Sequence, residues 1–407
     1  MRVLMFGWEF PPMSSGGLGT ACYGLTKGLS QEGIEISFVL PYADDNTNGE
    51  FVKLIPTSSI RKVKIIGINS LLHAYATSSQ YHNHLLRFKK NSRQRKLYGE
   101  DLFKEAYRFA IKASVIAEHE AFDMIHCHDW MTFEAGIRAR EISGKPLIVH
   151  VHATEFDRTG GNVNQRVYDI ERKGMHAADK IIAVSSFTKS KIIGHYGIQP
   201  DKVEVVHNAV ELKYTDYGEN FKVNNKDKVV LFLGRITMQK GPDYFIQAAK
   251  KCLEFDPGIK FIIAGTGDME GYIIEKAAEL GIADKVLFAG FVSNDDLDKM
   301  YQMADVYVMP SISEPFGITP LEAMKNGTPV IISKQSGVCE VLNHCLKVDF
   351  WDINQLADKI LAVLKYEEMS NELKKHGSFE IRKFDWKIPA RKCIGVYNKL
   401  LNGAVTA

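Results

Sequence analysis

Short apolar runs rich in β-branched residues alternate with helix-length amphipathic segments along almost the whole of this 407-residue sequence. Apolar runs of that kind are typical of the inner strands of a parallel sheet, because helices cover both faces of such a sheet. In the first half the runs lie at residues 2–8, 35–40, 62–68, 124–128, 147–152, 180–184 and 203–207. Residues 20–32 and 100–120 show helical spacing between them. This half is therefore predicted to be α/β.

A second series of the same kind follows a polar stretch at residues 211–227, which contains few aliphatic side chains. Its strand-like runs lie at residues 228–234, 259–265, 285–291, 305–310 and 329–333. Residues 354–376 then read as an amphipathic helix, and a last helix follows. Because 407 residues exceed one ordinary core, we predict two Rossmann-like domains that face each other across a cleft. We assign residues 1–207 to the first domain, 208–227 to a linker, 228–385 to the second domain, and 386–407 to a C-terminal helix that can cross back to the first domain.

Composition narrows the possible functions. The formal net charge of +2 argues against a nucleic-acid partner that is bound by the whole protein. No apolar run approaches the roughly 20 residues that span a bilayer, and the first residues lack the pattern of a signal peptide, so we expect a cytoplasmic protein. Residues 87–96, from Arg87 to Lys96, are strongly basic and suit either weak contact with a membrane or glucan or a solvated loop.

Glycines follow the first predicted strand, at Gly16, Gly17 and Gly19. Glycines at such a point let the backbone approach a phosphate and direct N–H groups at it. The motif is not the full fingerprint of dinucleotide-binding folds, and the acid expected about 20 residues on is Glu35, which itself starts a strand. This disfavours an NAD-dependent oxidoreductase, although a plain glycine-rich turn stays possible.

Two strands of the first half end abruptly in polar residues. One run ends in His126-Cys127-His128-Asp129, and another reaches His152 and the segment ATEFDRTGG. Polar groups at strand ends suit the binding of sugar hydroxyls or a departing phosphate. Histidines two apart share a face and could suggest a metal, but metal sites usually use three or four ligands, so we expect no metal.

The second half places cations and carboxylates at its strand ends. Arg235 and Lys240 follow its first strand and could stabilise a departing diphosphate, or could be solvated surface cations. Glu314 and Glu322 lie eight residues apart around a Pro-Phe-Gly turn, with a helix predicted to begin near Pro320. A loop carboxylate and a first-turn carboxylate would then border one site.

These motifs carry a resemblance to a known family. SISEPFGITPLEAMKNGTPVI, GRITMQKG, HNAV and SGVCEVL resemble the donor half of the retaining GT-B glycosyltransferases of the glycogen synthase and sucrose synthase type, which are of the glycosyltransferase family 4 kind. WEFPP, GGLGT, HCHDW and HATEFDRTGG are similar to the acceptor half of glycogen and starch synthases. The resemblance covers almost the whole chain and implies a GT-B fold.

The resemblance also implies roles for particular residues. Glu322 would hold the donor ribose, and Glu314 would grip the transferred sugar. His152 would lie beside the anomeric carbon, and Asp129 would lie near the acceptor. The donor site would comprise Gly16, Gly17, Arg235, Lys240, Phe316, Gly317, Ile318, Thr319 and Glu322, and the catalytic group would comprise His152, Arg235, Lys240, Glu314 and Asp129.

The expected function is retaining transfer of a sugar, most simply glucose from UDP- or ADP-glucose, to an α-glucan or oligosaccharide. The transfer of another sugar, such as mannose, to a lipid, glycoside or small molecule is the alternative, and a non-catalytic relative or a two-lobed sugar-binding protein are further ones. The D-x-D at Asp296 and Asp298 reads as a helix start rather than a metal site. We therefore expect no metal cofactor.

Overall fold

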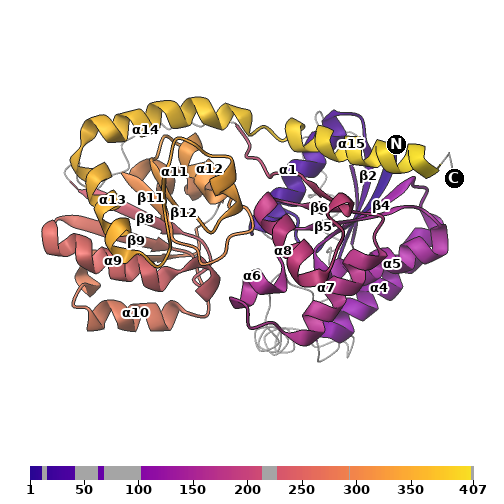
Figure 1. Ribbon diagram of the computed structural model, residues 1–407, viewed down its shortest axis with the longest axis horizontal. Helices are drawn as coiled ribbons and strands as arrows, with labels where there is room; N and C mark the ends of the chain where they lie inside the picture. The colour runs from indigo at the N-terminus through magenta and orange to yellow at the C-terminus, as the bar shows by residue number, and fades with distance from the viewer. Residues whose placement is uncertain (12–15, 42–62, 68–101, 213–226, 293, 405–407) are drawn as a thin grey trace.

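The computed structural model describes residues 1–11, 16–41, 63–67, 102–212, 227–292 and 294–404. They form two α/β halves that lie side by side, each with a parallel sheet between layers of helices (Figure 1). This arrangement confirms the predicted fold class. Most of the predicted linker, and the whole basic segment at 87–96, lie outside the described residues.

The sheet of the first half has seven described strands in the order β3-β2-β1-β4-β5-β6-β7, and every pairing is parallel. The strands are β1 (Arg2–Phe6), β2 (Glu35–Leu40), β3 (Val63–Gly67), β4 (Met124–His128), β5 (Leu147–Val151), β6 (Lys180–Ala183) and β7 (Val203–Val205). The chain adds strands on one side of β1 and then returns to add β4 on the other. In an open sheet of this kind the crevice at such a switch point, outside the carboxyl ends of the strands, is where ligands bind.

The sheet of the second half has six described strands in the order β10-β9-β8-β11-β12-β13. They are β8 (Lys228–Leu233), β9 (Ile259–Ala264), β10 (Val286–Gly290), β11 (Val306–Met309), β12 (Val330–Ser333) and β13 (Leu346–Val348). The switch point here lies between β8 and β11. The sequence pattern did not indicate β13, because three residues are too few to show a period.

Helices cover both sheets. In the first half they are α1 (Gly17–Gln31), α4 (Leu102–His119), α5 (Trp130–Ser143), α6 (Glu155–Thr159), α7 (Gln165–Ala177), α8 (Ser186–Tyr196) and the 3-10 turn η1 (Pro200–Lys202). In the second half they are η2 (Met238–Lys240), α9 (Pro242–Phe255), α10 (Glu270–Glu279), η3 (Ala283–Lys285), α11 (Asn294–Met303), α12 (Thr319–Lys325) and η4 (Gly337–Glu340).

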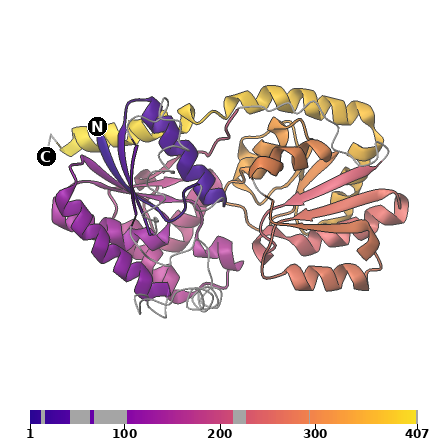
Figure 2. The same ribbon diagram turned by 180° about the vertical axis from the view of Figure 1, so that it is seen from behind.

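The C-terminal segment consists of α13 (Ile353–Lys365), α14 (Glu367–Glu380), η5 (Ile381–Lys383) and α15 (Lys387–Ala404). One helix was expected over residues 354–376, but the extended conformation of Tyr366 (φ −103°, ψ 100°) divides it in two. After α14 the chain crosses to the first half, where α15 packs on α1 (Figure 2). A Cβ at Gly24 would lie 2.0 Å from the Trp386 ring, so α15 docks where α1 has no side chain. None of the described helices has the length and apolar character needed to cross a membrane.

Candidate active site

A cavity of about 1160 Å³ lies between the two halves. Residues that follow β1 and β5 border it on one side, and residues that follow β8 and β11 border it on the other. Its walls include these predicted site residues: Gly16, Gly17, His152, Arg235, Lys240, Glu314, Phe316, Gly317, Ile318, Thr319 and Glu322. The structure thus brings together all of the predicted residues except Asp129, which is buried outside the wall.

Two cations enter the cavity from the segment between β8 and α9. Arg235 follows β8, and Lys240 ends η2 with its ammonium group paired to the Glu314 carboxylate. The next residue, Gly241, has a φ of 66°, and a Cβ on it would lie 2.2 Å from the Pro310 carbonyl oxygen. A turn that glycine alone can make without strain therefore directs Lys240 at the cavity.

Glu314 and the turn that follows it form the floor of the cavity. Glu314 is 7% exposed and also accepts a hydrogen bond from the Ser311 hydroxyl at 3.3 Å. Gly317 adopts a φ of 101°, which favours glycine, and the Val338 amide donates to the Phe316 carbonyl at 2.7 Å. The bond from Val338 therefore fixes the turn, and the turn residues that line the cavity are placed to contact a ligand.

Glu322 lies in the first turn of α12, as predicted. Its carboxylate accepts a hydrogen bond from the Tyr301 hydroxyl at 3.0 Å, and burial raises its pKa. The hydroxyl of Thr319, one turn earlier, accepts from the Tyr307 hydroxyl at 2.8 Å. Two buried tyrosines therefore fix the polar wall that faces the cavity from α12.

Across the cavity, the start of α1 presents the backbone of Gly16 and Gly17. A Cβ at Gly17 would meet nothing within 4 Å, so this backbone borders open space. Sequence reasoning missed the part played by Glu9, which is 6% exposed and accepts a hydrogen bond from the Gly19 amide at 2.9 Å. A Cβ at Gly16 would lie 2.8 Å from the Glu9 carboxylate. Glu9 therefore anchors the glycine loop, and its place straight after β1 was the available signal.

Four buried histidines lie together here. His126 and His128 belong to β4, His150 belongs to β5, and His152 follows the end of β5. The sheet register pairs His128 with His150, which the sequence alone could not show. His128 Nδ1 lies 3.0 Å from His152 Nε2, and His126 Nε2 lies 3.3 Å from His150 Nδ1. Burial lowers the pKa of all four, in the case of His128 to about 3. The imidazole at the cavity wall is therefore neutral.

The stack and Cys22 of α1 together form two groups of possible metal ligands, which are His126, His128 and His150, and Cys22, His128 and His152. The rings of His126 and His128 are stacked 4.5 Å apart at 19°, so their in-plane lone pairs run nearly parallel rather than toward one ion. Burial raises the pKa of Cys22 well above its usual value, which disfavours the thiolate that binds metals. As placed, the four rings form a hydrogen-bonded stack.

Asp129 lies behind His152 rather than in the cavity. Its Oδ1 accepts hydrogen bonds from the amides of His152 at 2.6 Å and Ala153 at 3.3 Å. Its backbone has φ 60° and ψ 173°, a region that is essentially restricted to glycine. Burial raises the pKa of Asp129 to about 7, against the lowering effect of the nearby Arg158 charge. The strained aspartate therefore holds the turn that carries His152, and its contact with an acceptor stays a prediction.

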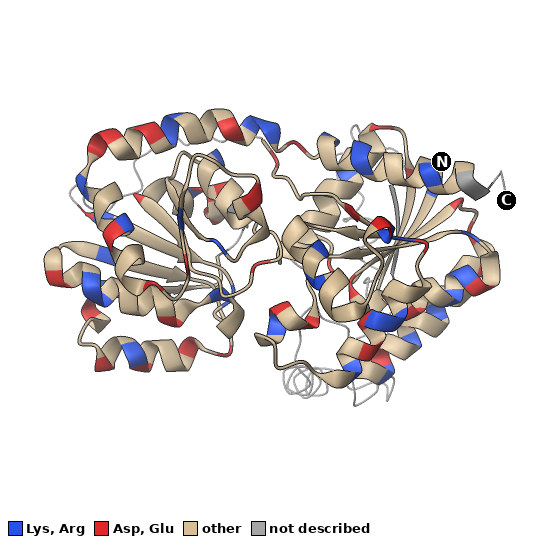
Figure 3. Cartoon of the chain, in the orientation of Figure 1, with Lys and Arg blue, Asp and Glu red and all other residues tan. Residues whose placement is uncertain are grey.

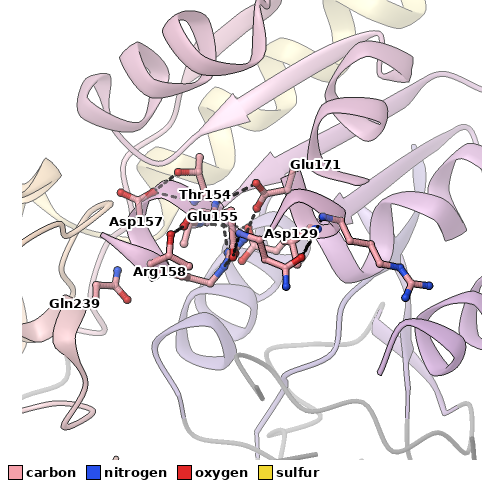
Figure 4. Close-up of polar contacts among 12 residues, drawn as sticks. Asp129, Thr154, Glu155, Asp157, Arg158, Glu171 and Gln239 are labelled. Atoms are coloured by element: carbon pink, nitrogen blue, oxygen red, sulfur yellow. Dashed lines mark hydrogen bonds and ion pairs between the residues drawn. The ribbon is translucent and has the colours of Figure 1, made fainter. Parts of the chain in front are cut away.

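A second polar network lies around α6 (Figure 4). His152 and Ala153, which come shortly before this helix, line the cavity. Thr154 and Asp157 form a capping box at the start of this helix. Arg158 pairs with the buried carboxylates of Glu155 and Glu171. Paired in this way, the buried charges give α6 a fixed position next to the second half, because unpaired ones would be costly to bury.

The fold and the cavity define a glycosyltransferase of the GT-B class. The chain matches the model described as Glycosyltransferase Family 4 over residues 15–214 and the one described as Glycosyl transferases group 1 over residues 215–378, and it belongs to this family.

The relatives agree with this assignment. The chain is 30% identical to an uncharacterized glycosyltransferase of Methanocaldococcus jannaschii, with 98% of both chains covered. It is 24% identical to the glycogen synthase of Mycobacterium tuberculosis over 98% of this chain and 94% of that one. It is 27% identical to a D-inositol 3-phosphate glycosyltransferase of Segniliparus rotundus over 73% of this chain and 72% of that one.

Solved structures share the fold at low sequence identity. Sucrose-phosphate synthase from Thermosynechococcus elongatus superimposes with a TM-score of 0.79 at 18% identity, with 99% of both chains covered. Anabaena HepE in complex with UDP and glucose gives a TM-score of 0.73 at 18% identity over 98% of this chain and 100% of that one.

Proposed function

We propose that this glycosyltransferase moves glucose from UDP- or ADP-glucose to an α-glucan or oligosaccharide, with retention of the anomeric configuration. One observation carries the proposal. Arg235, Lys240, Glu314 and Glu322 of the second half converge on one cavity, opposite the Gly16–Gly17 backbone and His152 of the first half. That set matches the separate needs of a diphosphate, a ribose and a hexose.

The diphosphate would lie between the two cations and the glycine loop. Arg235 offers a planar fork of donors, and Lys240 offers a point charge that would turn from Glu314 to the phosphate. The amide of Gly17, on the open side of the loop, would reach the phosphate from the first half. Positive groups on both sides would stabilise the charge that develops as the diphosphate departs.

The two carboxylates would bind the two sugars of the donor. Glu322, held by the Tyr301 hydroxyl, would accept hydrogen bonds from the ribose. Glu314 and the amides of residues 316–318 would bind the hexose hydroxyls, with His152 near the anomeric carbon. Neutral His152 orients the sugar and adds no positive charge beside the oxocarbenium-like centre.

In the proposed reaction an acceptor hydroxyl attacks the anomeric carbon from the face that the diphosphate leaves. The bond from that carbon to the phosphate oxygen breaks, the new glycosidic bond forms, and the acceptor proton passes to the departing phosphate. A double-displacement enzyme would need a carboxylate nucleophile close to the anomeric carbon. We assign Glu314, which would keep its hydrogen bond from Ser311 when Lys240 turns to the phosphate, to the hexose hydroxyls rather than to attack on the anomeric carbon. The two cations would do the work that a divalent ion does elsewhere, so we propose that no metal is required.

The choice of glucose and an α-glucan rests on relatives. The glycogen synthase of M. tuberculosis matches nearly the full chain, and the solved Anabaena HepE holds UDP and glucose. The test incubates purified protein with UDP-, ADP- and GDP-sugars, with and without maltooligosaccharides. We expect UDP- or ADP-glucose to release its nucleoside diphosphate only when an oligosaccharide is present, and we expect that oligosaccharide to become longer. An inverted anomeric configuration in the product would refute retention.

A second candidate is sugar transfer to a small phosphorylated polyol, because several relatives are D-inositol 3-phosphate glycosyltransferases. The same assay with inositol phosphate as acceptor separates the two. Donor turnover with the polyol and none with the glucan would keep the transferase and replace the acceptor.

A further inference from the structure

The residues on either side of Glu314 are both held by the first half. Ser313 contacts Asp157 and Lys191, which belong to α6 and α8, and Pro315 contacts the beginning of α8. Glu314 itself points into the cavity and is not part of these contacts. The short segment that carries the proposed sugar ligand is therefore fixed at both ends by the opposite half of the molecule.

The contact through Ser313 is buried and charged. The Ser313 hydroxyl donates to Asp157 Oδ1 at 2.6 Å and accepts from Lys191 Nζ at 2.5 Å, and Lys191 also pairs with Asp157. Asp157 is fully buried, and Ser313 is 6% exposed. The Gln239 side chain, which lies next to α6 in Figure 4, donates to the Ser313 carbonyl at 2.9 Å. Charge-assisted hydrogen bonds between buried groups are strong, so this contact joins the halves firmly.

The contact through Pro315 uses the first turn of α8. Ser185, the N-cap, donates its hydroxyl to the Pro315 carbonyl at 2.5 Å, and Thr188 donates to the same oxygen at 3.2 Å. Gly337 of the second half lies against Ser185, since a Cβ on it would be 2.5 Å from Ser185 Cβ and 2.2 Å from the Pro315 oxygen. A side chain at 337 would therefore clash with the Pro315 carbonyl of its own half and with Ser185 of the first half.

The contact extends to Glu340 at the end of η4. Its carboxylate accepts from the Ser186 amide at 2.8 Å and lies 2.5 Å from His207 Nε2. The Gly337 amide in the same turn donates to the Glu314 carbonyl at 2.9 Å. The backbone of Glu314 is therefore bonded to η4, the turn that also contacts Ser185 and Ser186 of the first half.

From this geometry we infer that Ser185, Thr188, Asp157 and Lys191 are positioning residues that complete the hexose subsite when the two halves close. The inference rests on the proposed function, because it takes Glu314 as a ligand of the transferred sugar. The proposed ribose ligand Glu322 is bonded to Tyr301 of its own half. The proposed diphosphate ligand Arg235 contacts Gln239 at 3.4 Å, a longer contact than those that hold Ser313 and Pro315. Closure should thus govern the sugar part of donor binding more than the nucleotide part.

The test removes two of the three hydroxyls that bond across the interface and keeps that of Ser185, the N-cap of α8. The closure variant is Thr188→Val with Ser313→Ala, and its matched control is Thr26→Val with Thr328→Val. Thr26 and Thr328 are also buried and donate to the carbonyls of Cys22 and Tyr301, but each bond stays within one half. A steric variant, Gly337→Ala, is paired with Gly194→Ala in α8, where an added Cβ meets nothing within 4 Å.

Calorimetry with UDP, ADP and their glucose conjugates measures binding, and small-angle scattering measures the radius of gyration. In the closure variant we expect affinity for the nucleotide sugar to fall about tenfold, with nucleotide alone changed less than about twofold, because two neutral or charge-assisted bonds are lost. Gly337→Ala should show the same split, and both variants should have a larger radius of gyration than their controls.

Equal weakening of nucleotide and nucleotide sugar, or equal behaviour of closure and control variants, would overturn the inference. If wild-type protein binds no nucleotide at all, the proposed function fails. In that case an unchanged radius of gyration in the closure variants would show that these contacts do not hold the halves together, and an increased one would confirm the closure contacts without their role in sugar binding. Thermal unfolding of each variant identifies any that does not fold.

Discussion

The two halves build their sides of the cavity in different ways. In the second half the site residues lie in two short segments, one after β8 and one between β11 and the first turn of α12. In the first half they come from the loop after β1, the start of α1 and the end of β5, with Asp129 and His128 behind them. One side is local in sequence, whereas the other depends on how strands pair.

That difference sets how each side should respond to mutation. A residue of the second half acts on the ligand directly, so its loss should appear as lost binding or turnover. A residue of the first half often acts through a neighbour, as Asp129 acts on the His152 backbone, so its loss should also appear in stability.

The largest effect is expected on the second-half side. Arg235→Ala should lower kcat/KM by about 10³, because a guanidinium that faces a departing diphosphate contributes mainly in the transition state. Arg235→Lys should recover part of this, since it restores the charge without the planar fork. Steady-state kinetics with the active donor is the measurement. Arg391→Ala, which removes an arginine 66% exposed on α15, is the control and should stay within about twofold. A loss as large in the control would mean that Arg235 has no special role.

On the first-half side we expect Asp129 to make the free energy of unfolding depend on pH. Burial raises its pKa in the folded protein to about 7, against about 3.9 in an unfolded chain. As pH rises from about 4 to about 7, the unfolded chain ionises this carboxyl while the folded one resists. The free energy of unfolding should therefore fall by about 4 kcal/mol through that window and level off above it.

Asp129→Asn removes the titration but keeps an oxygen for the two amides, and asparagine tolerates positive φ better than most residues. The measurement is urea unfolding of both proteins from pH 4.5 to 8. The stability of wild type minus that of the variant should decline as pH rises. A flat difference would mean that Asp129 ionises without cost, held by Arg158 and the amides.

The sequence predicted the second-half side well because each of its motifs is contiguous. Arg235, Lys240, Glu314 and Glu322 could be read from strand ends and spacing, and the structure places all four on one cavity. The alternation of strands and helices likewise predicted twelve of the thirteen described strands to within two residues at each end, with β13 missed. The predicted ends of β1 and β7, at residues 8 and 207, each lie two residues past the observed ends.

The rest needed three-dimensional information. The pairing of His128 with His150 depends on sheet register, and the anchoring of the glycine loop by Glu9 depends on how a loop folds back. The closure contacts join residues about 120 to 150 positions apart, which no spacing rule relates. A sequence shows which residues suit a site more readily than which residues hold them in place.

A smaller effect should separate the two carboxylates of the second half. Glu322→Gln should weaken nucleoside diphosphate binding about tenfold, because a charged partner of the ribose is lost. Glu314→Gln should leave nucleotide affinity within about threefold and lower kcat/KM for the nucleotide sugar by a similar tenfold or more. Calorimetry and kinetics on the same preparations provide the comparison. Glu372→Gln, on the exposed face of α14, is the control. An identical pattern in both variants would contradict the separate roles.

The smallest effect is expected from metal removal. The proposed use of Arg235 and Lys240 for the diphosphate predicts that protein dialysed against EDTA keeps its activity within about twofold. The histidine stack makes this a demanding test, because its imidazoles and Cys22 form two groups of three possible metal ligands that share His128. Elemental analysis before and after dialysis should find less than one metal ion per ten chains. If EDTA abolishes activity and Zn²⁺ or Mg²⁺ restores it, the stabilisation of the departing diphosphate would be assigned to a metal rather than to Arg235 and Lys240. The histidines of the first half would then be the candidate ligands of that metal. His128→Asn would then show whether that stack is the site, since it removes the ring common to both candidate ligand groups.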